Sequence, residues 1–144
     1  MKPLPHEYDL HLSGDTSAYG LLTGEGLPEL RTASPKDFDG PGDAWTPEHL
    51  LLAAIDACFL FTFRAMARAS KVGYSALALD SAGTVDRQDG VTRFTDIRLR
   101  ARLTVPPGTD RDRAQRLLEK AERGCLVSAS LSTPVHLDTE IVEG

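Results

Sequence analysis

Cys58 and Cys125 are the only two cysteines in the chain, and they are the side chains best suited to chemistry. Each lies in an apolar stretch with the composition of a helix, residues 47–64 and residues 122–131. A buried thiol pair is either inert packing or a redox couple, because a free Cys packs as a small hydrophobe but reacts as a thiolate. In a redox couple, one thiolate attacks a peroxide O–O bond to give a sulfenic acid, and the second thiol then closes a disulfide. The residue types alone leave both interpretations open.

The sequence around both thiols opposes ionisation. Cys58 would lie in the middle of a helix among apolar side chains, so burial would raise its pKa, and an ionised Asp56 nearby would raise it further. Cys125 follows the C-terminal end of a predicted helix, where the helix dipole disfavours a thiolate. We therefore expect a cation beside Cys58 if it is the attacking thiol, whereas the surroundings of Cys125 suit a resolving thiol.

Length and charge narrow the class of protein. The chain has 144 residues, which is most simply a single domain over residues 1–144, and its net charge of −5 argues against a nucleic-acid surface. The N-terminus has no apolar core, so no signal peptide is expected, and the apolar run 50–63 is too short to span a bilayer and contains Asp56. We expect a cytoplasmic protein that binds no membrane. In that reducing compartment a cysteine pair is more often catalytic or redox-sensing than structural.

A long central helix would position the first thiol. Thr46 suits its N-cap, Pro47 its first position and Glu48 the positive end of its dipole. The helix is expected to continue to about Ser70, with Gly73 as the stop signal. Between residues 50 and 69, apolar side chains cover nearly every direction around the helix. A helix of this kind must be enclosed on all sides. We therefore expect a homodimer in which a partner subunit covers the face that one chain leaves open.

A β-hairpin follows the central helix. Residues 97–105 alternate between apolar and polar, and they pair with residues 77–87 through a turn at Asp89-Gly90. A two-residue turn alone would put the two apolar faces on opposite sides of the sheet. A three-residue loop or a bulge, with Gly90 left-handed, restores the match and brings Asp80 opposite Arg100. The side chains expected to point inward from the first strand are Leu77, Leu79 and Val85.

The remaining elements complete an α+β chain. We expect two or three short strands within residues 6–33, a loop over 34–43, a helix from residue 110 to 123 closed by Gly124, a helical turn carrying Cys125, and a last strand over 135–141. The expected architecture is an antiparallel sheet wrapped around the central helix.

Two motifs resemble those of the OsmC/Ohr family of thiol peroxidases. The first is Pro47-Glu48-x-Leu50 leading to Cys58, and the second is Cys125-x-x-Ser128-x-x-Leu131 followed by Pro134-Val135. The resemblance covers residues 34–140 and implies an OsmC-like fold, an intertwined homodimer and reduction of organic hydroperoxides without a cofactor. It also implies that Cys58 attacks, that Cys125 resolves in a Cys58–Cys125 disulfide, and that a lipoyl or thioredoxin-like dithiol reduces it. The two thiols must then come within disulfide reach.

The resemblance further implies a role for Glu48. In the better-studied branch of the family, a Glu at this spacing binds an arginine from an N-terminal Gly-rich strand, and that arginine contacts the reactive sulfur. Residues 13–20 contain no Arg or Lys, so Arg31 becomes the candidate, followed by Arg64 and Arg68.

A second class of function stays open. A non-enzymatic protein of the same fold could hold a hydrophobic ligand between its subunits, with the thiols incidental, and the missing N-terminal arginine favours it. For the peroxidase, an apolar wall is expected around the reactive thiol, consisting of Phe59, Phe61, Phe63, Leu126 and Val127.

Other polar and aromatic residues have local explanations. The four histidines are scattered, so no metal site is predicted, and His49 is expected to be solvated. Ser128 and Ser130 are expected to bind nearby backbone groups, and Trp45 to pack as a staple before the central helix.

Overall fold

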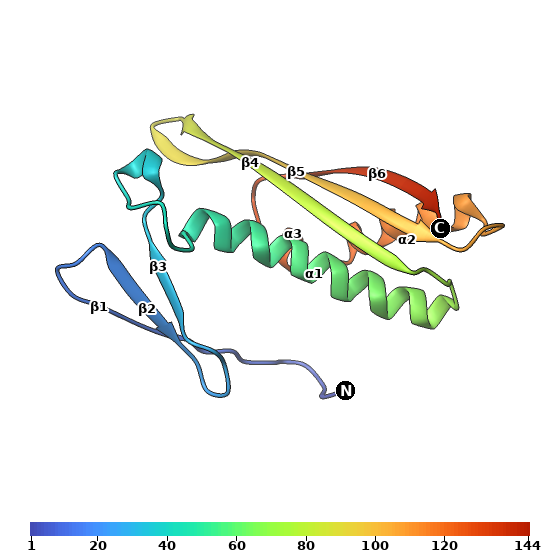
Figure 1. Cartoon of the computed structure of the whole chain (residues 1–144), viewed down its shortest axis with the longest axis horizontal. Coiled ribbons are helices and arrows are strands. Elements are labelled where there is room, and N and C mark those ends of the chain that lie inside the picture. The colour runs from blue at the N-terminus through green and yellow to red at the C-terminus, as the bar shows by residue number, and fades with distance from the viewer. The chain divides into compact units, whose positions relative to one another are not determined.

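The computed structural model describes residues 1–144 and has the α+β class expected from the sequence. In chain order the elements are β1 (His11–Gly14), β2 (Tyr19–Thr23), β3 (Leu30–Ala33), η1 (Lys36–Phe38), α1 (Pro47–Ser70), β4 (Ala76–Gln88), β5 (Val91–Val105), α2 (Arg111–Arg123), α3 (Leu126–Ala129) and β6 (Val135–Glu143) (Figure 1). Contacts divide the chain into two compact units, Met1–Leu51 and Leu52–Gly144. The expectation of a single domain over residues 1–144 stays a prediction.

The first unit contains an antiparallel three-stranded sheet in the order β1-β2-β3. The loop after β3 is tight at Gly40, where an added Cβ would come within 1.6 Å of the Ser34 carbonyl oxygen, so only glycine fits. Beyond this loop the Trp45 carbonyl accepts hydrogen bonds from the Thr32 hydroxyl (2.6 Å) and the Ala33 N–H (3.0 Å). The Trp45 side chain is 50% exposed, and its role as a packing staple stays a prediction.

Helix α1 begins as the sequence predicts. The Thr46 hydroxyl accepts a hydrogen bond from the His49 N–H at 3.0 Å and lies 2.7 Å from His49 Nδ1, which confirms Thr46 as the N-cap. The helix ends at Ser70, as expected, before the stop signal at Gly73. Lys71 takes the left-handed conformation (φ 55°) directly after Ser70, and the Val72 N–H bonds back to the Ala67 carbonyl at 2.9 Å. This is the usual way to close a helix, here with a lysine in the glycine position.

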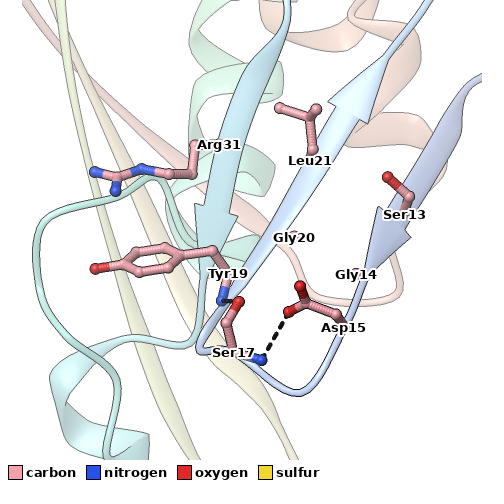
Figure 2. Close-up of a pocket in the computed structure, with 8 residues that line it drawn as sticks. All are labelled: Ser13, Gly14, Asp15, Ser17, Tyr19, Gly20, Leu21 and Arg31. Carbon is pink, nitrogen blue, oxygen red and sulfur yellow. Dashed lines mark hydrogen bonds between the residues drawn. The ribbon is translucent and has the colours of Figure 1, made fainter.

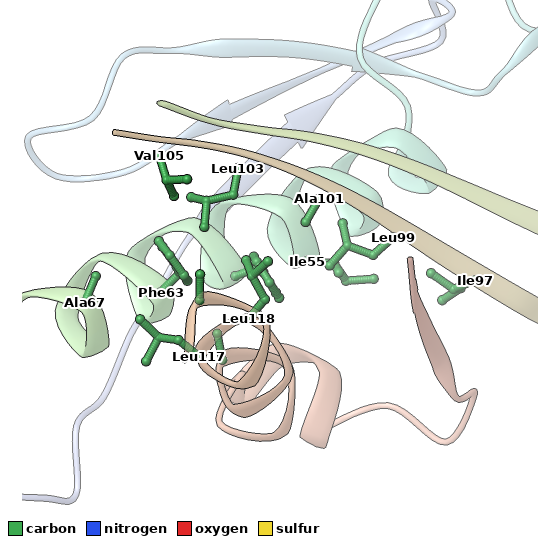
Figure 3. Close-up of a cluster of buried hydrophobic side chains, with 13 residues drawn as sticks. Ile55, Phe63, Ala67, Ile97, Leu99, Ala101, Leu103, Val105, Leu117 and Leu118 are labelled. Carbon is green, nitrogen blue, oxygen red and sulfur yellow. The ribbon is translucent and has the colours of Figure 1, made fainter. Parts of the chain in front are cut away.

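One face of α1 forms the centre of the core in the second unit. Its buried residues recur every fourth position: Ile55, Phe59, Phe63 and Ala67. They pack against the inward side chains of β5 (Ile97, Leu99, Ala101, Leu103, Val105) and of α2 (Ala114, Leu117, Leu118, Ala121), as Figure 3 shows. Because the period of β5 is two and that of the helices is near four, each element presents one apolar face to the others.

The second sheet has the order β4-β5-β6 and is mixed. Strands β4 and β5 are antiparallel, as expected, but β5 and β6 pair in parallel, so the prediction of a wholly antiparallel sheet was wrong. The chain leaves β5 at one end, passes through α2 and α3, and re-enters the sheet in the same direction. Two parallel strands require a crossover of this kind, and here the crossover carries Cys125.

The β4–β5 hairpin confirms that a bulge is needed to place the apolar faces of both strands on the same side of the sheet. Its turn has two residues, Asp89 (φ 51°) and Gly90 (φ 78°), both left-handed, and the pairing shifts by one residue through a bulge at Thr95. Asp80 therefore lies opposite Arg100.

The inward residues of β4 were predicted only in part. Leu77 and Leu79 pack against the core, but Val85 is 38% exposed. From Ala82 to the turn every residue of β4 is exposed, because the tip of the hairpin extends past the buried cluster.

By length and composition alone, α1 is a helix that could cross a membrane. The expectation that its apolar run, residues 50–63, is too short to span a bilayer was therefore wrong, because the whole helix is longer than that run. The core helix of a soluble protein passes the same test, and α1 packs one face into the core of the second unit. Its Asp56 carboxylate accepts a hydrogen bond from the Ser81 hydroxyl of β4 at 2.9 Å. These contacts support the interpretation of α1 as a core helix.

Candidate active site

The crossover between β5 and β6 lies directly against α1 at the two cysteines. An added Cβ on Gly124 would meet Met66 Cε at 2.9 Å and Thr62 Cγ2 at 3.6 Å, both on α1. The next residue, Cys125, is the N-cap of α3 and is fully buried, whereas Cys58 on α1 is half-buried. The small residue before Cys125 therefore permits the close approach of the two elements.

The two thiols lie side by side, although they are far apart in the sequence. The two thiols are close enough for each to shift the pKa of the other, and both cysteines are reduced. The Thr62 hydroxyl lies 3.9 Å from Cys58 Sγ, one helical turn further along α1. The structure thus brings together the two sequence-predicted thiols and adds Thr62. The signal for Thr62 was its i+4 spacing from Cys58.

The surroundings of Cys58 favour its thiolate. Partial burial opposes ionisation, but the backbone N–H of Val127, the Cys125 thiol, the Thr62 hydroxyl and the backbone N–H of Leu126 together lower the pKa of Cys58 below its ordinary value. The expected cation is not among these groups. Backbone N–H groups at the start of α3 take its place in lowering the pKa of Cys58.

The surroundings of Cys125 have the opposite effect. Burial raises the pKa of Cys125, and the neighbouring Cys58 raises it further by accepting the Cys125 proton in a hydrogen bond and by its charge. The hydroxyl and the N–H of Ser128 oppose this rise but do not cancel it. Cys58 is therefore the thiol that ionises first, while Cys125 keeps its proton.

These opposite shifts predict the order in which the thiols react as the pH rises. Below the pKa of Cys58 both groups are protonated and react slowly with iodoacetamide, since the thiolate is the nucleophile. The labelling of Cys58 should reach half its maximum at a pH below that of an ordinary thiol, and the labelling of Cys125 at a pH above it. Peptide-resolved mass spectrometry of the reduced protein measures both midpoints. The midpoint is the quantity to compare, because burial slows Cys125 at every pH; coincident or reversed midpoints would contradict the assignment.

Arg31 lies on β3 and is engaged elsewhere. Its Nη2 donates a hydrogen bond to the Asp43 backbone carbonyl at 3.1 Å and lies 3.6 Å from the Asp43 carboxylate. Its guanidinium stacks 4.3 Å from the centre of the Tyr19 ring, beside a hollow of about 430 Å³ lined by β1 and β2 (Figure 2). The Tyr19 hydroxyl donates to the same Asp43 carboxylate at 2.9 Å. In this chain, Asp43 and Tyr19 are therefore the partners of Arg31.

The Glu48 carboxylate forms no ion pair with an arginine. It is half-buried in the first turn of α1, and its Oε2 is buried without a hydrogen bond. The structure does not join Glu48 to Arg31, and the roles predicted for both residues stay predictions. The two cations placed behind Arg31 are exposed on α1, where Arg64 stacks 5.2 Å from the Phe61 ring centre.

The apolar wall differs from the one expected. Phe59 and Phe63 are fully buried in the core, so their placement in the wall was wrong. Residues one and five positions after Cys58 point to another side of a helix, whereas Phe61, three positions on, shares its face. Phe61 is 56% exposed and Leu126, at the start of α3, is 71% exposed.

The fold and the thiol pair now define the class of protein. The family described as OsmC-like protein has a model that matches residues 40–140. The chain therefore belongs to the OsmC-like family, and its place among the OsmC/Ohr proteins agrees with the resemblance seen in the sequence. That family is associated with peroxide and redox stress.

Individual relatives differ in how well they are described. The uncharacterized protein YmaD of Bacillus subtilis is 31% identical over 109 residues, which cover 74% of this chain and 73% of YmaD. Peroxiredoxin OsmC of Escherichia coli is 31% identical over 97 residues, covering 66% of each chain. A crystal structure of an organic hydroperoxide resistance protein OsmC from Legionella pneumophila has a TM-score of 0.76 over 97% of this chain and 99% of that chain, at 22% identity. This structural likeness shows the fold alone.

Proposed function

We propose that the protein is a thiol-dependent peroxidase that reduces organic hydroperoxides. The observation that carries the proposal is the pairing of Cys58, whose pKa is lowered by the N–H groups of α3, with a protonated Cys125 in contact with it. A thiol pair that served only as packing would require no donors directed at one of its sulfurs. The name of the relative peroxiredoxin OsmC supports the same activity.

The proposed cycle uses the two thiols in sequence. The Cys58 thiolate attacks the terminal peroxide oxygen, the O–O bond breaks, and the alkoxide leaves and takes up a proton to form an alcohol. Cys58 is now a sulfenic acid. The Cys125 sulfur attacks it, so that an S–S bond forms, the S–O bond breaks and water leaves. An external dithiol, lipoyl or thioredoxin-like in chemistry, then reduces the disulfide by thiol–disulfide exchange.

We also propose that the working form is a homodimer. The face of α1 opposite its buried residues remains open, and its exposed members recur every fourth position: Ala57, Phe61, Ala65 and Ala69. Only 22% of the apolar window of this helix is buried within the chain. A second copy of the chain would cover this surface, as the sequence pattern requires.

A substrate comparison tests the proposed activity. Apolar surface contributes about 25 cal/mol per Å² when buried, so an alkyl or aryl tail that buries roughly 100 Å² against Phe61 and Leu126 gains about 2.5 kcal/mol. We expect kcat/KM for cumene hydroperoxide to exceed that for hydrogen peroxide by at least about tenfold, since about 1.4 kcal/mol corresponds to that factor. The assay follows both thiols with a maleimide before and after one equivalent of each peroxide.

The outcomes separate the two classes of function. Joint loss of both thiols, reversed by dithiothreitol, supports the peroxidase. If neither peroxide oxidises Cys58, the hydrophobic-ligand-binding alternative is favoured. Equal rates with both peroxides would show that Phe61 and Leu126 do not contact the substrate.

A further inference from the structure

Thr62 lies one helical turn after Cys58 on α1 and turns two different groups toward its neighbours. Its hydroxyl oxygen lies 3.9 Å from Cys58 Sγ. Its methyl carbon, Cγ2, faces the crossover, where a Cβ added to Gly124 would lie 3.6 Å from it. The same added Cβ would lie 2.9 Å from Cε of Met66, one turn further along α1. Thr62 therefore connects the reactive thiol to the segment that carries Cys125.

Ser130 shows the usual partner of a hydroxyl in a helix. Serine and threonine hydroxyls in helices commonly donate to the backbone carbonyl three or four residues earlier. Ser130, at the end of α3, donates in this way to the Leu126 carbonyl at 2.7 Å, which confirms the prediction that it binds local backbone. The Oγ of Ser128 is buried without a hydrogen-bond partner, so the same prediction was wrong for Ser128. A backbone carbonyl is thus the acceptor that a hydroxyl inside α1 would ordinarily take.

The hydroxyl of Thr62 takes a different partner. The carbonyl four residues earlier belongs to Cys58, but the hydroxyl lies at the Cys58 sulfur instead. A thiol sulfur is a weak acceptor compared with a carbonyl oxygen. The direction of the Thr62 hydroxyl therefore needs a second contact that favours it.

Packing against the crossover supplies this contact. Met66 is half-buried and packs against the core, with its methyl beside Gly124. Gly124 has φ −91° and ψ 0°, a conformation open to residues with a side chain, so its lack of one serves packing rather than backbone freedom. Because the methyl and the hydroxyl of a threonine share one carbon, a Thr62 methyl held at the crossover fixes where the hydroxyl points. A serine in its place would lack this constraint.

We propose that Gly124 and Met66 hold the Thr62 hydroxyl on the Cys58 sulfur through the Thr62 methyl, so that the docked crossover sets the reactivity of the attacking thiol. Thr62 touches the reacting atom, whereas Gly124 and Met66 are positioning residues that act through it. The inference rests on the proposed peroxidase function for its effect on turnover, but the direction of the hydroxyl can be tested without a peroxide.

The contact acts on the first chemical step, the attack of Cys58 on the peroxide. A hydroxyl donor stabilises a thiolate more than a thiol, and the Thr62 hydroxyl contributes to the lowered pKa of Cys58. No proton passes through Thr62 in this step: the sulfur donates an electron pair to oxygen, the O–O bond breaks, and the leaving alkoxide takes up a proton. Loss of the donor lowers the fraction of thiolate at any pH below the pKa of Cys58, and the rate of attack falls with it.

Two substitutions at one position separate the methyl from the hydroxyl. Thr62→Val keeps the shape and removes the hydroxyl, whereas Thr62→Ser keeps the hydroxyl and removes the methyl. In both, the pH midpoint of iodoacetamide labelling of Cys58 should rise by a similar amount, because a serine hydroxyl without the methyl turns to the Cys58 carbonyl. Trapping with dimedone after one equivalent of cumene hydroperoxide should show sulfenic-acid formation slowed about two- to fivefold in both, as for loss of one weak hydrogen bond. A Thr62→Ser midpoint closer to that of the unmodified protein than to that of Thr62→Val would overturn the proposal.

A substitution on the crossover tests the positioning role of Gly124. In Gly124→Ala the new methyl would overlap Met66 Cε, so the crossover and the methyls of Met66 and Thr62 must move apart. The Cys58 midpoint should rise, as in Thr62→Val. In the double variant Gly124→Ala/Thr62→Val it should rise no further than in the more affected single variant, because both changes withdraw the same hydroxyl. A larger rise would show that Gly124 acts on the sulfur by another route and would overturn its role here.

Thr95→Ser is the matched control for loss of a threonine methyl. Thr95 is on β5, and its hydroxyl donates to the Thr84 carbonyl at 3.4 Å. The substitution should leave both the Cys58 midpoint and the rate of sulfenic-acid formation unchanged. A midpoint raised as much as in Thr62→Ser would show that the effect is not specific to Thr62 and would contradict the proposal.

The labelling experiment distinguishes failure of this inference from failure of the proposed function. Iodoacetamide reacts with a thiolate whether or not the protein reduces peroxides. Raised midpoints in Thr62→Ser and Gly124→Ala would support the positioning of the hydroxyl even if no peroxide oxidised Cys58. Unchanged midpoints in a protein that does reduce cumene hydroperoxide would contradict this inference alone.

Discussion

Replacement of Cys58 by serine is expected to abolish peroxide turnover. A serine hydroxyl does not ionise near neutral pH and is a far weaker nucleophile toward a peroxide than a thiolate, so no sulfenic acid forms. We expect kcat/KM for cumene hydroperoxide to fall at least about 1,000-fold, which corresponds to about 4 kcal/mol of barrier. Peroxide consumption in the presence of dithiothreitol measures the loss.

The fold should survive this change. Cys58 is half-buried and lies outside the core cluster, and a serine is close to it in size and can still meet the Thr62 hydroxyl. Circular dichroism and the melting temperature of Cys58→Ser should therefore match those of the unmodified protein. Thr62→Val is the matched comparison, because it removes one donor to the sulfur but keeps the thiol, and it should slow turnover only modestly. Substantial activity in Cys58→Ser would show that another residue attacks the peroxide.

The sequence predicted the elements that depend on local rules. Thr46, Pro47 and Glu48 mark the start of α1 by the chemistry of a helix terminus, and the structure confirms the cap. The hairpin register followed from parity alone, since only a bulge or an odd loop could bring Asp80 opposite Arg100. The direction of β6 depends instead on where the crossover re-enters the sheet. No local pattern in residues 135–141 encodes that direction, and the prediction of an antiparallel strand was wrong.

The candidate site was likewise predictable where it depends on residue type, but not where it depends on packing between elements. The two cysteines could be identified by residue type. The expected resistance of Cys125 to ionisation is also present, but burial causes it and not the helix end that the sequence suggested. What the sequence could not show is that the first N–H groups of α3 point at Cys58, because this depends on how the crossover packs on α1. A cation beside Cys58 was expected because the sequence did not reveal these backbone donors. Backbone donors carry no sequence signature, and Leu126 and Val127 appeared only as apolar side chains.

Replacement of Cys125 by serine is expected to leave the first oxidation intact and to stop the cycle there. The serine keeps a hydroxyl in place of the thiol that helps lower the pKa of Cys58, so sulfenic-acid formation should proceed at a similar rate. Without a second thiol no intramolecular disulfide closes. Under excess peroxide the sulfenic acid then gains a second oxygen and becomes a sulfinic acid, which dithiothreitol does not reduce.

A single experiment with intact-protein mass spectrometry follows this fate. Cys125→Ser should gain one oxygen atom in the first turnover and a second as peroxide is raised, while the unmodified protein loses two hydrogens and gains no oxygen. Cys125→Ala is the matched variant: it also lacks the donor to Cys58, so its first oxidation should be slower than that of Cys125→Ser because the Cys58 pKa rises. Repeated turnover in Cys125→Ser without added oxygen on Cys58 would mean that an external thiol resolves the sulfenic acid directly. The contact between the two thiols would then be a matter of packing rather than of chemistry.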